Sequence, residues 1–170
     1  TKKATINISN VVLDRNVSIY GGGDIADVDD ATININSGTF SKISIYGGGD
    51  GYGGTAKTGN SKINITGGNF NEYVQSTGGG YSYISSQAPT TTTNVSISGG
   101  NFNSGSVERG TLIFAGGMGD EPNSSSPVEN ANLRITGGTF NNATLNNDPV
   151  RSSLEIFGGG FGTAPVKNTT

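Results

Sequence analysis

One short stretch spells a phosphate-binding motif. Residues 49–54 read GDGYGG, a G-x-G-x-x-G sequence that follows a strand-like run. A phosphate cradle of this kind needs a helix directly after the glycines, because the helix N-terminus holds the pyrophosphate. The chain instead continues TAKTGNSKINITGG, which lacks the apolar period of a helix. We therefore predict no nucleotide site at these glycines.

A second candidate is a group of carboxylates. Asp24, Asp27 and Asp29 lie within one short segment, and Asp30 follows directly. Carboxylate oxygens at short spacing are the ligands that Ca²⁺ prefers. The spacing matches no standard calcium loop, and the glutamate of an EF-hand is missing. The segment is either a weak calcium site or a solvated acidic loop, and no other cofactor is expected.

A third candidate is a set of tyrosines in polar surroundings. We predict that Tyr52, Tyr81 and Tyr83 bind a ligand, because each follows a glycine-rich segment among polar neighbours. Aromatic rings beside polar side chains are suited to stacking against sugars. The competing interpretation is that some of these rings cap an apolar interior.

Catalysis has weak support in the sequence. The chain contains no His and no Cys, so the commonest general base, the commonest metal ligand and a thiol nucleophile are all missing. A polysaccharide-cleaving site would need paired carboxylates. Glu72, Asp148 and Glu155 have no evident partners along the sequence. We predict that the protein is not an enzyme, with a β-helix lyase or glycoside hydrolase as the alternative.

Composition and charge limit the classes of partner that the chain can be expected to bind. The net charge is −3 without a basic cluster, so nucleic acid is not expected to bind. No apolar run approaches the length of a membrane span, and we expect no membrane insertion of this segment. The chain has 29 glycines and a hydrophobic share of 31%, a mixture that favours strands and turns.

The elements that position these residues come from an internal repeat. Five segments align without gaps. Each has a central isoleucine, and Leu or Phe follows five residues later. A second strand-like unit that ends in glycines follows each of them. The segments are TINISNVVL (5–13), TININSGTF (32–40), KINITGGNF (62–70), NVSISGGNF (94–102) and NLRITGGTF (132–140). We place the repeats at about 5–31, 32–61, 62–93, 94–131 and 132–162.

Alternation within the repeats predicts strands that stack. Aliphatic residues flank an outward column that reads Asn7, Asn34, Asn64, Ser96 and Arg134. In the second unit we expect Ser18, Ser44, Gln75 and Glu155 to point outward. One repeat has too few apolar side chains to fold alone. The repeats must therefore stack, so that the Ile and Phe residues at equivalent positions form buried rows. The fold class is therefore all-β, a parallel solenoid of about five two-strand repeats in a single module over residues 1–170.

The units INSGTFSKISIYGGG and ITGGTF…IFGGG resemble repeats of large surface-anchored and secreted proteins of gut-type Gram-positive bacteria. That resemblance implies a right-handed parallel β-helix of the pectin-lyase type, an extracellular location on the bacterial cell surface, and adhesion to a glycan or a host surface protein through variable loops. It also implies that this chain is a segment of a larger protein with flanking repeats. A purely structural stalk or filament segment is the remaining alternative.

Overall fold

The computed structural model describes residues 2–104, 110–142 and 154–170 of the chain. These residues form strands, turns and loops without a helix, and the strands pair in parallel within three sheets. The predicted all-β class with parallel pairing is confirmed. Asp148, one of the acids weighed for catalysis, lies outside the described residues.

The first sheet collects the first strand of every repeat, in chain order. Its outward asparagines form ladders: Asn34 donates to Asn7 and Asn64 donates to Asn34, each at 2.7 Å. The strands begin before the predicted repeat starts, so Asp29 and Asp30 lie in a strand and not in a loop. Beyond the last predicted repeat, a further strand joins the sheet. In order, the strands are β1 (Lys3–Ile8), β3 (Val28–Ile35), β5 (Thr58–Ile65), β8 (Thr90–Ile97), β12 (Val128–Ile135) and β16 (Val166–Thr169).

The second sheet collects the second strand of every repeat. In the first three repeats this is one long strand, and in the last two it is described in two parts. The strand of the third repeat therefore pairs with one part at its start and with the other at its end. The strands are β2 (Val11–Tyr20), β4 (Gly38–Tyr46), β6 (Asn69–Thr77), β9 (Asn101–Ser104), β10 (Thr111–Phe114), β13 (Thr139–Asn142) and β14 (Leu154–Phe157).

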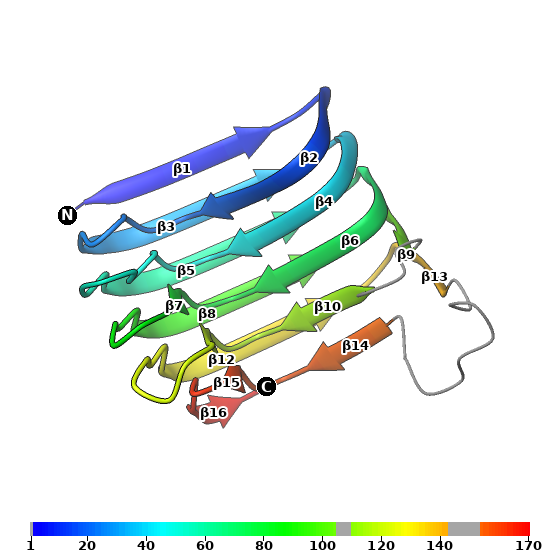
Figure 1. The fold of residues 1–170 in the computed structure, drawn as a ribbon. Coiled ribbons are helices and arrows are strands. Elements are labelled where there is room, and N and C mark those ends of the chain that lie inside the picture. The colour runs from blue at the N-terminus through cyan, green and yellow to red at the C-terminus, as the bar shows by residue number, and fades with distance from the viewer. Residues whose placement is uncertain (1, 105–109, 143–153) are drawn as a thin grey trace.

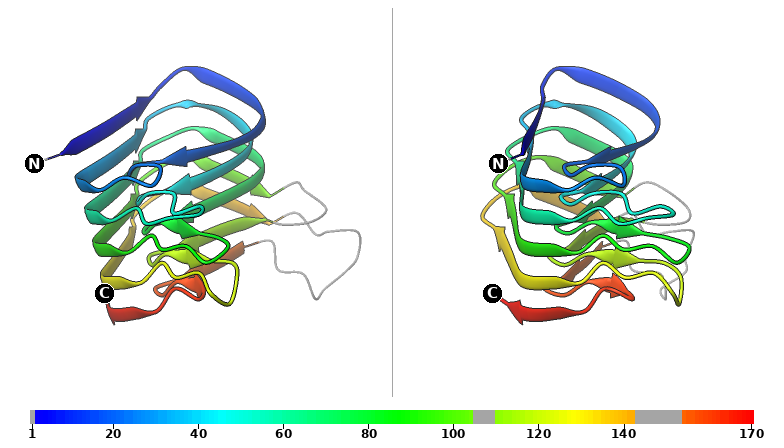
Figure 2. Two further views of the ribbon diagram at one scale, coloured as in Figure 1. Left: turned by 60° about the vertical axis from the view of Figure 1, so that its left-hand side comes forward. Right: turned by 90° about the vertical axis from the view of Figure 1, so that its left-hand side faces the viewer.

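The third sheet is short and follows the glycine segments. It comprises β7 (Tyr81–Ser82), β11 (Met118–Gly119) and β15 (Phe161–Gly162). Single bridges from Asp24 to Asp50 and from Asp50 to Tyr81 continue it into the first two repeats. Figures 1 and 2 show the repeats as successive layers, from β1 at one end to β14–β16 at the other. Each layer contributes to all three sheets.

The interior contains the predicted rows of apolar side chains. Ile33, Ile35, Ile63, Ile65 and Ile97 are completely buried and form one cluster with residues of the second sheet. The phenylalanines form a continuous stack in the same interior, as predicted. The ring centroids are 5.0 Å apart for Phe40–Phe70, 4.6 Å for Phe70–Phe102 and 4.6 Å for Phe102–Phe140.

Glycine at the corners permits the layers to approach closely. A Cβ atom added to Gly47 would lie 2.2 Å from the carbonyl oxygen of Gly78 in the next repeat. Gly47 also donates a backbone hydrogen bond of 2.9 Å to Thr77. A side chain at Gly47 would therefore separate the two layers and break this contact.

Candidate functional site

The second sheet presents a row of polar and aromatic side chains on its outer face. In β4, Ile43 and Ile45 are buried in the core, so the alternation places Lys42, Ser44 and Tyr46 on the opposite face. Strand register extends this outer face to both neighbouring repeats. The matched residues are Asn16, Ser18 and Tyr20 on β2 and Tyr73, Gln75 and Thr77 on β6.

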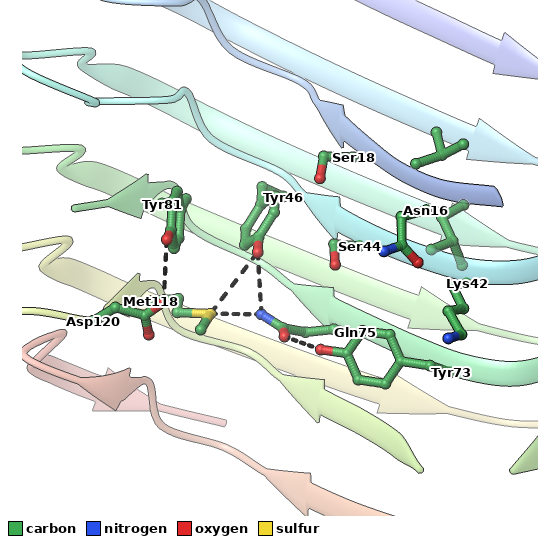
Figure 3. Close-up of a pocket in the computed structure, with 12 residues that line it drawn as sticks. Asn16, Ser18, Lys42, Ser44, Tyr46, Tyr73, Gln75, Tyr81, Met118 and Asp120 are labelled. Carbon is green, nitrogen blue, oxygen red and sulfur yellow. Dashed lines mark hydrogen bonds between the residues drawn. The ribbon is translucent and has the colours of Figure 1, made fainter. Parts of the chain in front are cut away.

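A pocket of about 360 Å³ lies on this outer face. The outward residues of β2, β4 and β6 form one part of its wall. The opposite part comes from the third sheet, through Tyr81 and Met118, and from the loop that follows, through Asp120. Figure 3 shows these side chains arranged around the hollow. The fold therefore brings together residues from four repeats that are distant in the sequence.

Gln75 organises the closed end of the pocket. Its Nε2 atom donates to the Met118 sulfur at 2.6 Å and to the Tyr46 hydroxyl at 3.4 Å. Its Oε1 atom accepts a hydrogen bond from the Tyr73 hydroxyl. The prediction that Gln75 points into solvent is wrong, because its side chain is 2% exposed. A buried amide needs such partners, and the tyrosines and the methionine supply them.

Tyr73 presents the broad face of its ring in the view onto the pocket (Figure 3). The side chain is half-buried, and the hydrogen bond to Gln75 fixes the position of its hydroxyl. A fixed aromatic face beside amide and hydroxyl groups can contact the C–H face of a sugar ring while hydrogen bonds hold the sugar hydroxyls.

Tyr81 lies at the same pocket, as one of the predicted binding residues. Its ring packs at a tilt against Tyr46, with centroids 5.2 Å apart, and its hydroxyl donates to Asp120 at 3.1 Å. Burial and then Asp120 raise the pKa of Tyr81. Burial and then Asp50 raise the pKa of Tyr20 to about 12. Both phenols therefore stay protonated at neutral pH and act as hydrogen-bond donors.

The other two predicted binding residues pair with each other elsewhere. Tyr52 and Tyr83 stack with ring centroids 5.9 Å apart, and neither lines the pocket. Tyr52 is 55% exposed. Because the two rings cover one face of each other, only their outer faces remain for a ligand. Their binding role stays a prediction.

The predicted calcium ligands do not gather into a metal site. Asp27 accepts a hydrogen bond from the Lys57 amide at 3.0 Å, and Asp29 accepts one from the Lys2 amide at 2.6 Å. Within the described parts of the chain, no three acidic side chains come close enough to hold a metal ion. Calcium binding at Asp24, Asp27 and Asp29 stays a prediction.

A larger hollow, of about 660 Å³, crosses the beginning of the first sheet. It is lined by the prolines 89, 127 and 165 and by charged residues. Two of these charges, Lys167 and Glu129, form an exposed ion pair at 3.8 Å. No aromatic ring lines this hollow. The smaller pocket therefore has the stronger case for a specific ligand.

Tyr81, a binding residue predicted from the sequence, lies at the pocket, whereas Gln75, Met118 and Tyr46 were not predicted there. The available signal was a break in the repeat. The second unit reads ISIYGGG in the second repeat and VQSTGGG in the third, so polar residues replace an aliphatic and an aromatic one. Such a departure from a stacked pattern is expected at a functional or a strained position.

Comparison with known protein families, curated sequences and solved structures gives no match to this chain. Among the described residues, no helix is long and apolar enough to cross a membrane.

Proposed function

We propose that this protein is a non-catalytic ligand-binding module of a bacterial surface protein, and that it binds a glycan in the pocket beside Tyr73. The observation that carries the proposal is the combination of a fixed aromatic face with hydrogen-bonding groups around one hollow. Ser44 and Tyr81 supply polar atoms there, Gln75 holds the hydroxyl of Tyr73 in place, and Tyr73 supplies the platform.

The architecture supports a scaffold role for the rest of the chain. Successive layers that pass through the same three sheets suit a parallel β-helix, and parallel crossovers are right-handed in nearly all proteins. A right-handed β-helix extends when repeats are added and keeps each outer face in register. Such a module fits an extracellular adhesin, in line with the resemblance to surface proteins and the flanking repeats which that resemblance implies.

A glycan fits this pocket better than a host protein. A stable protein interface typically covers about 800 Å² on each partner, whereas this site is a small concave hollow. A peptide cannot extend the sheet at the pocket, because β4 is paired on both sides by β2 and β6. Binding of a host protein is an outcome that the test below can reveal.

The pocket has little of what glycoside hydrolysis requires. Among the described residues that line it, Asp120 is the carboxylate, and it accepts the hydrogen bond from Tyr81. A glycosidase typically places two carboxylates about the scissile bond. This favours binding without turnover over the lyase or hydrolase alternative.

A glycan and host-protein array tests the proposal, followed by calorimetry on the best ligand. We expect Tyr73→Ala to weaken glycan binding at least tenfold, because it removes the platform. Tyr52→Ala is the matched control, since Tyr52 lies outside the pocket, and it should leave the affinity unchanged. If Tyr52→Ala abolishes binding and Tyr73→Ala does not, the ligand binds at the Tyr52–Tyr83 pair. Binding to proteins alone, or release of sugar ends, would contradict the proposal.

A further inference from the structure

The pocket is the deep end of a trough that follows the stacking axis. Ser18 on β2 and Ser44 on β4 are register partners, and Gln75 on β6 continues the same column. Ser18 is exposed, Ser44 is half-buried and Gln75 is buried. Exposure along this column therefore falls from the first repeat to the third, and the two serines are its smallest side chains.

Larger side chains form the two walls of this trough. Tyr20 and Tyr46 stack along one side, with ring centroids 4.9 Å apart. Asn16 and Lys42, register partners of each other, follow the opposite side. Figure 3 shows Ser18 and Ser44 between Tyr46 on one side and Asn16 and Lys42 on the other. Layers of a parallel sheet are about 4.8 Å apart, so the trough has room for roughly two sugar rings in line.

The trough is closed at the third repeat. Tyr73 follows Lys42 in its column, and its hydroxyl reaches Gln75 in the adjacent column. Met118 and Tyr46 hold the Gln75 amide from the other side. This bridge of side chains stands across the line of the trough, so a chain that enters from the first repeat must end there.

The charged side chains described at the trough have partners within the protein. Lys42 forms an ion pair with Glu72 at 3.7 Å, and Asp120 accepts the hydroxyl of Tyr81. Among the described residues, Lys42 is the cation that lines the pocket. In the part of the pocket that the structure describes, an acidic sugar would therefore meet no cation without a partner, and the carboxylate of Asp120 would repel it. Neutral hydroxyl groups match the serine, amide and phenol groups that the trough presents.

We propose that the site receives the end of a linear, uncharged glycan chain, with its terminal ring on Tyr73 and the next ring over Ser44 and Ser18. This inference rests on the proposed function, because it specifies the ligand of the same pocket. It distinguishes the protein from a module that binds internal units of a glycan chain and from one that binds a single sugar.

The test uses calorimetry with linear neutral oligosaccharides of one to six units, built from glucose, mannose or N-acetylglucosamine. Oligogalacturonates of the same lengths serve as acidic counterparts. Affinity should rise up to about two or three units and then stay constant, with the acidic series at least tenfold weaker. Ser18→Tyr should weaken trimer binding at least tenfold and affect monomer binding less, because it fills the part of the trough farthest from Tyr73.

Ser96→Tyr is the matched control, since Ser96 lies on the outer column of the first sheet, as the register partner of Asn64 and Arg134. It should change neither affinity. If Tyr73→Ala abolishes binding but Ser18→Tyr leaves the trimer unaffected, the chain does not follow the trough and this inference fails alone. Preference for the acidic series also overturns it alone. If no oligosaccharide binds, or Tyr73→Ala has no effect, the proposed function fails together with the inference.

Discussion

Two aromatic columns run through the repeats, one inside and one outside. The inner column, Phe40, Phe70, Phe102 and Phe140, is continuous across four repeats. The outer column begins with Tyr20 and Tyr46, but Thr77 occupies its place in the third repeat and Phe114 resumes it in the fourth. Tyr81 of the third sheet packs against Tyr46 where the column is interrupted.

The difference between the columns shows which positions packing constrains. The inner column repeats one side chain because each ring needs a matching ring above and below it in a dry interior. The outer column is interrupted at Thr77 of β6. On the same strand, Gln75 and Tyr73 form the closed end of the pocket together with Met118. In a repeat protein, the irregular layer is therefore the place to search for a ligand.

The largest effect is expected in the inner column. Phe70 is 1% exposed and stacks on both faces, so Phe70→Ala should reduce the free energy of unfolding by about 3–5 kcal/mol. Phe140 is only half-buried in the last layer, and Phe140→Ala should cost clearly less. Guanidinium denaturation measures both variants. Equal losses would show that the column is not one cooperative stack.

A smaller effect, an increase in stability, is expected at Ser76 on the inner face of β6. Ser76 faces inward between Ile45 and Ile113 in its register column, and its buried hydroxyl has no hydrogen-bond partner. Ser76→Ala removes this unpaired group, so it should raise the free energy of unfolding by about 1 kcal/mol. Glycan affinity should not change, because Ser76 lies on the inner face. Loss of stability in this variant would mean that the hydroxyl has a partner in solution.

A third effect arises at alkaline pH, where tyrosine titrates and phenylalanine does not. Burial and Asp50 raise the pKa of Tyr20 to about 12, above the ordinary value of about 10. The unfolded chain releases this proton first, so the contribution of Tyr20 to stability should be constant below pH 10 and fall as the pH rises from about 10 to 12. Thermal unfolding across this range measures the loss.

Asp50→Asn provides the control for that titration. It removes a nearby negative charge, so the pKa of Tyr20 should decrease toward its ordinary value. The ultraviolet absorbance of tyrosinate follows the change directly. An unchanged titration would contradict the interaction of Asp50 with Tyr20.

The stacked strands could be predicted from the sequence because their pattern is redundant. Ile33, Ile63 and Phe70 each have counterparts at matching places in other repeats, so five copies support one inference. The same argument places the glycines at the corners. Alternation alone, however, sets only which face a side chain takes, and it put Gln75 in solvent although that outer face is covered.

The pocket depends on contacts between sheets that no local pattern specifies. Tyr81 meets Tyr46 because the third sheet folds back beside the second, and Met118 reaches Gln75 from another repeat. Neighbours in the sequence were a poor guide here: Tyr81 and Tyr83 are two residues apart, yet Tyr83 stacks with Tyr52. Three-dimensional placement was needed to separate these tyrosines.

The central claim is that the break in the outer column forms the binding site. The most direct measurement is an amide and side-chain NMR titration with the neutral oligosaccharide that binds best. Signals of Tyr73, Gln75 and Ser44 should shift together along one saturable curve, while those of Tyr52 and Tyr83 stay still. Shifts confined to Tyr52 and Tyr83, or to the proline-lined hollow, would contradict the account.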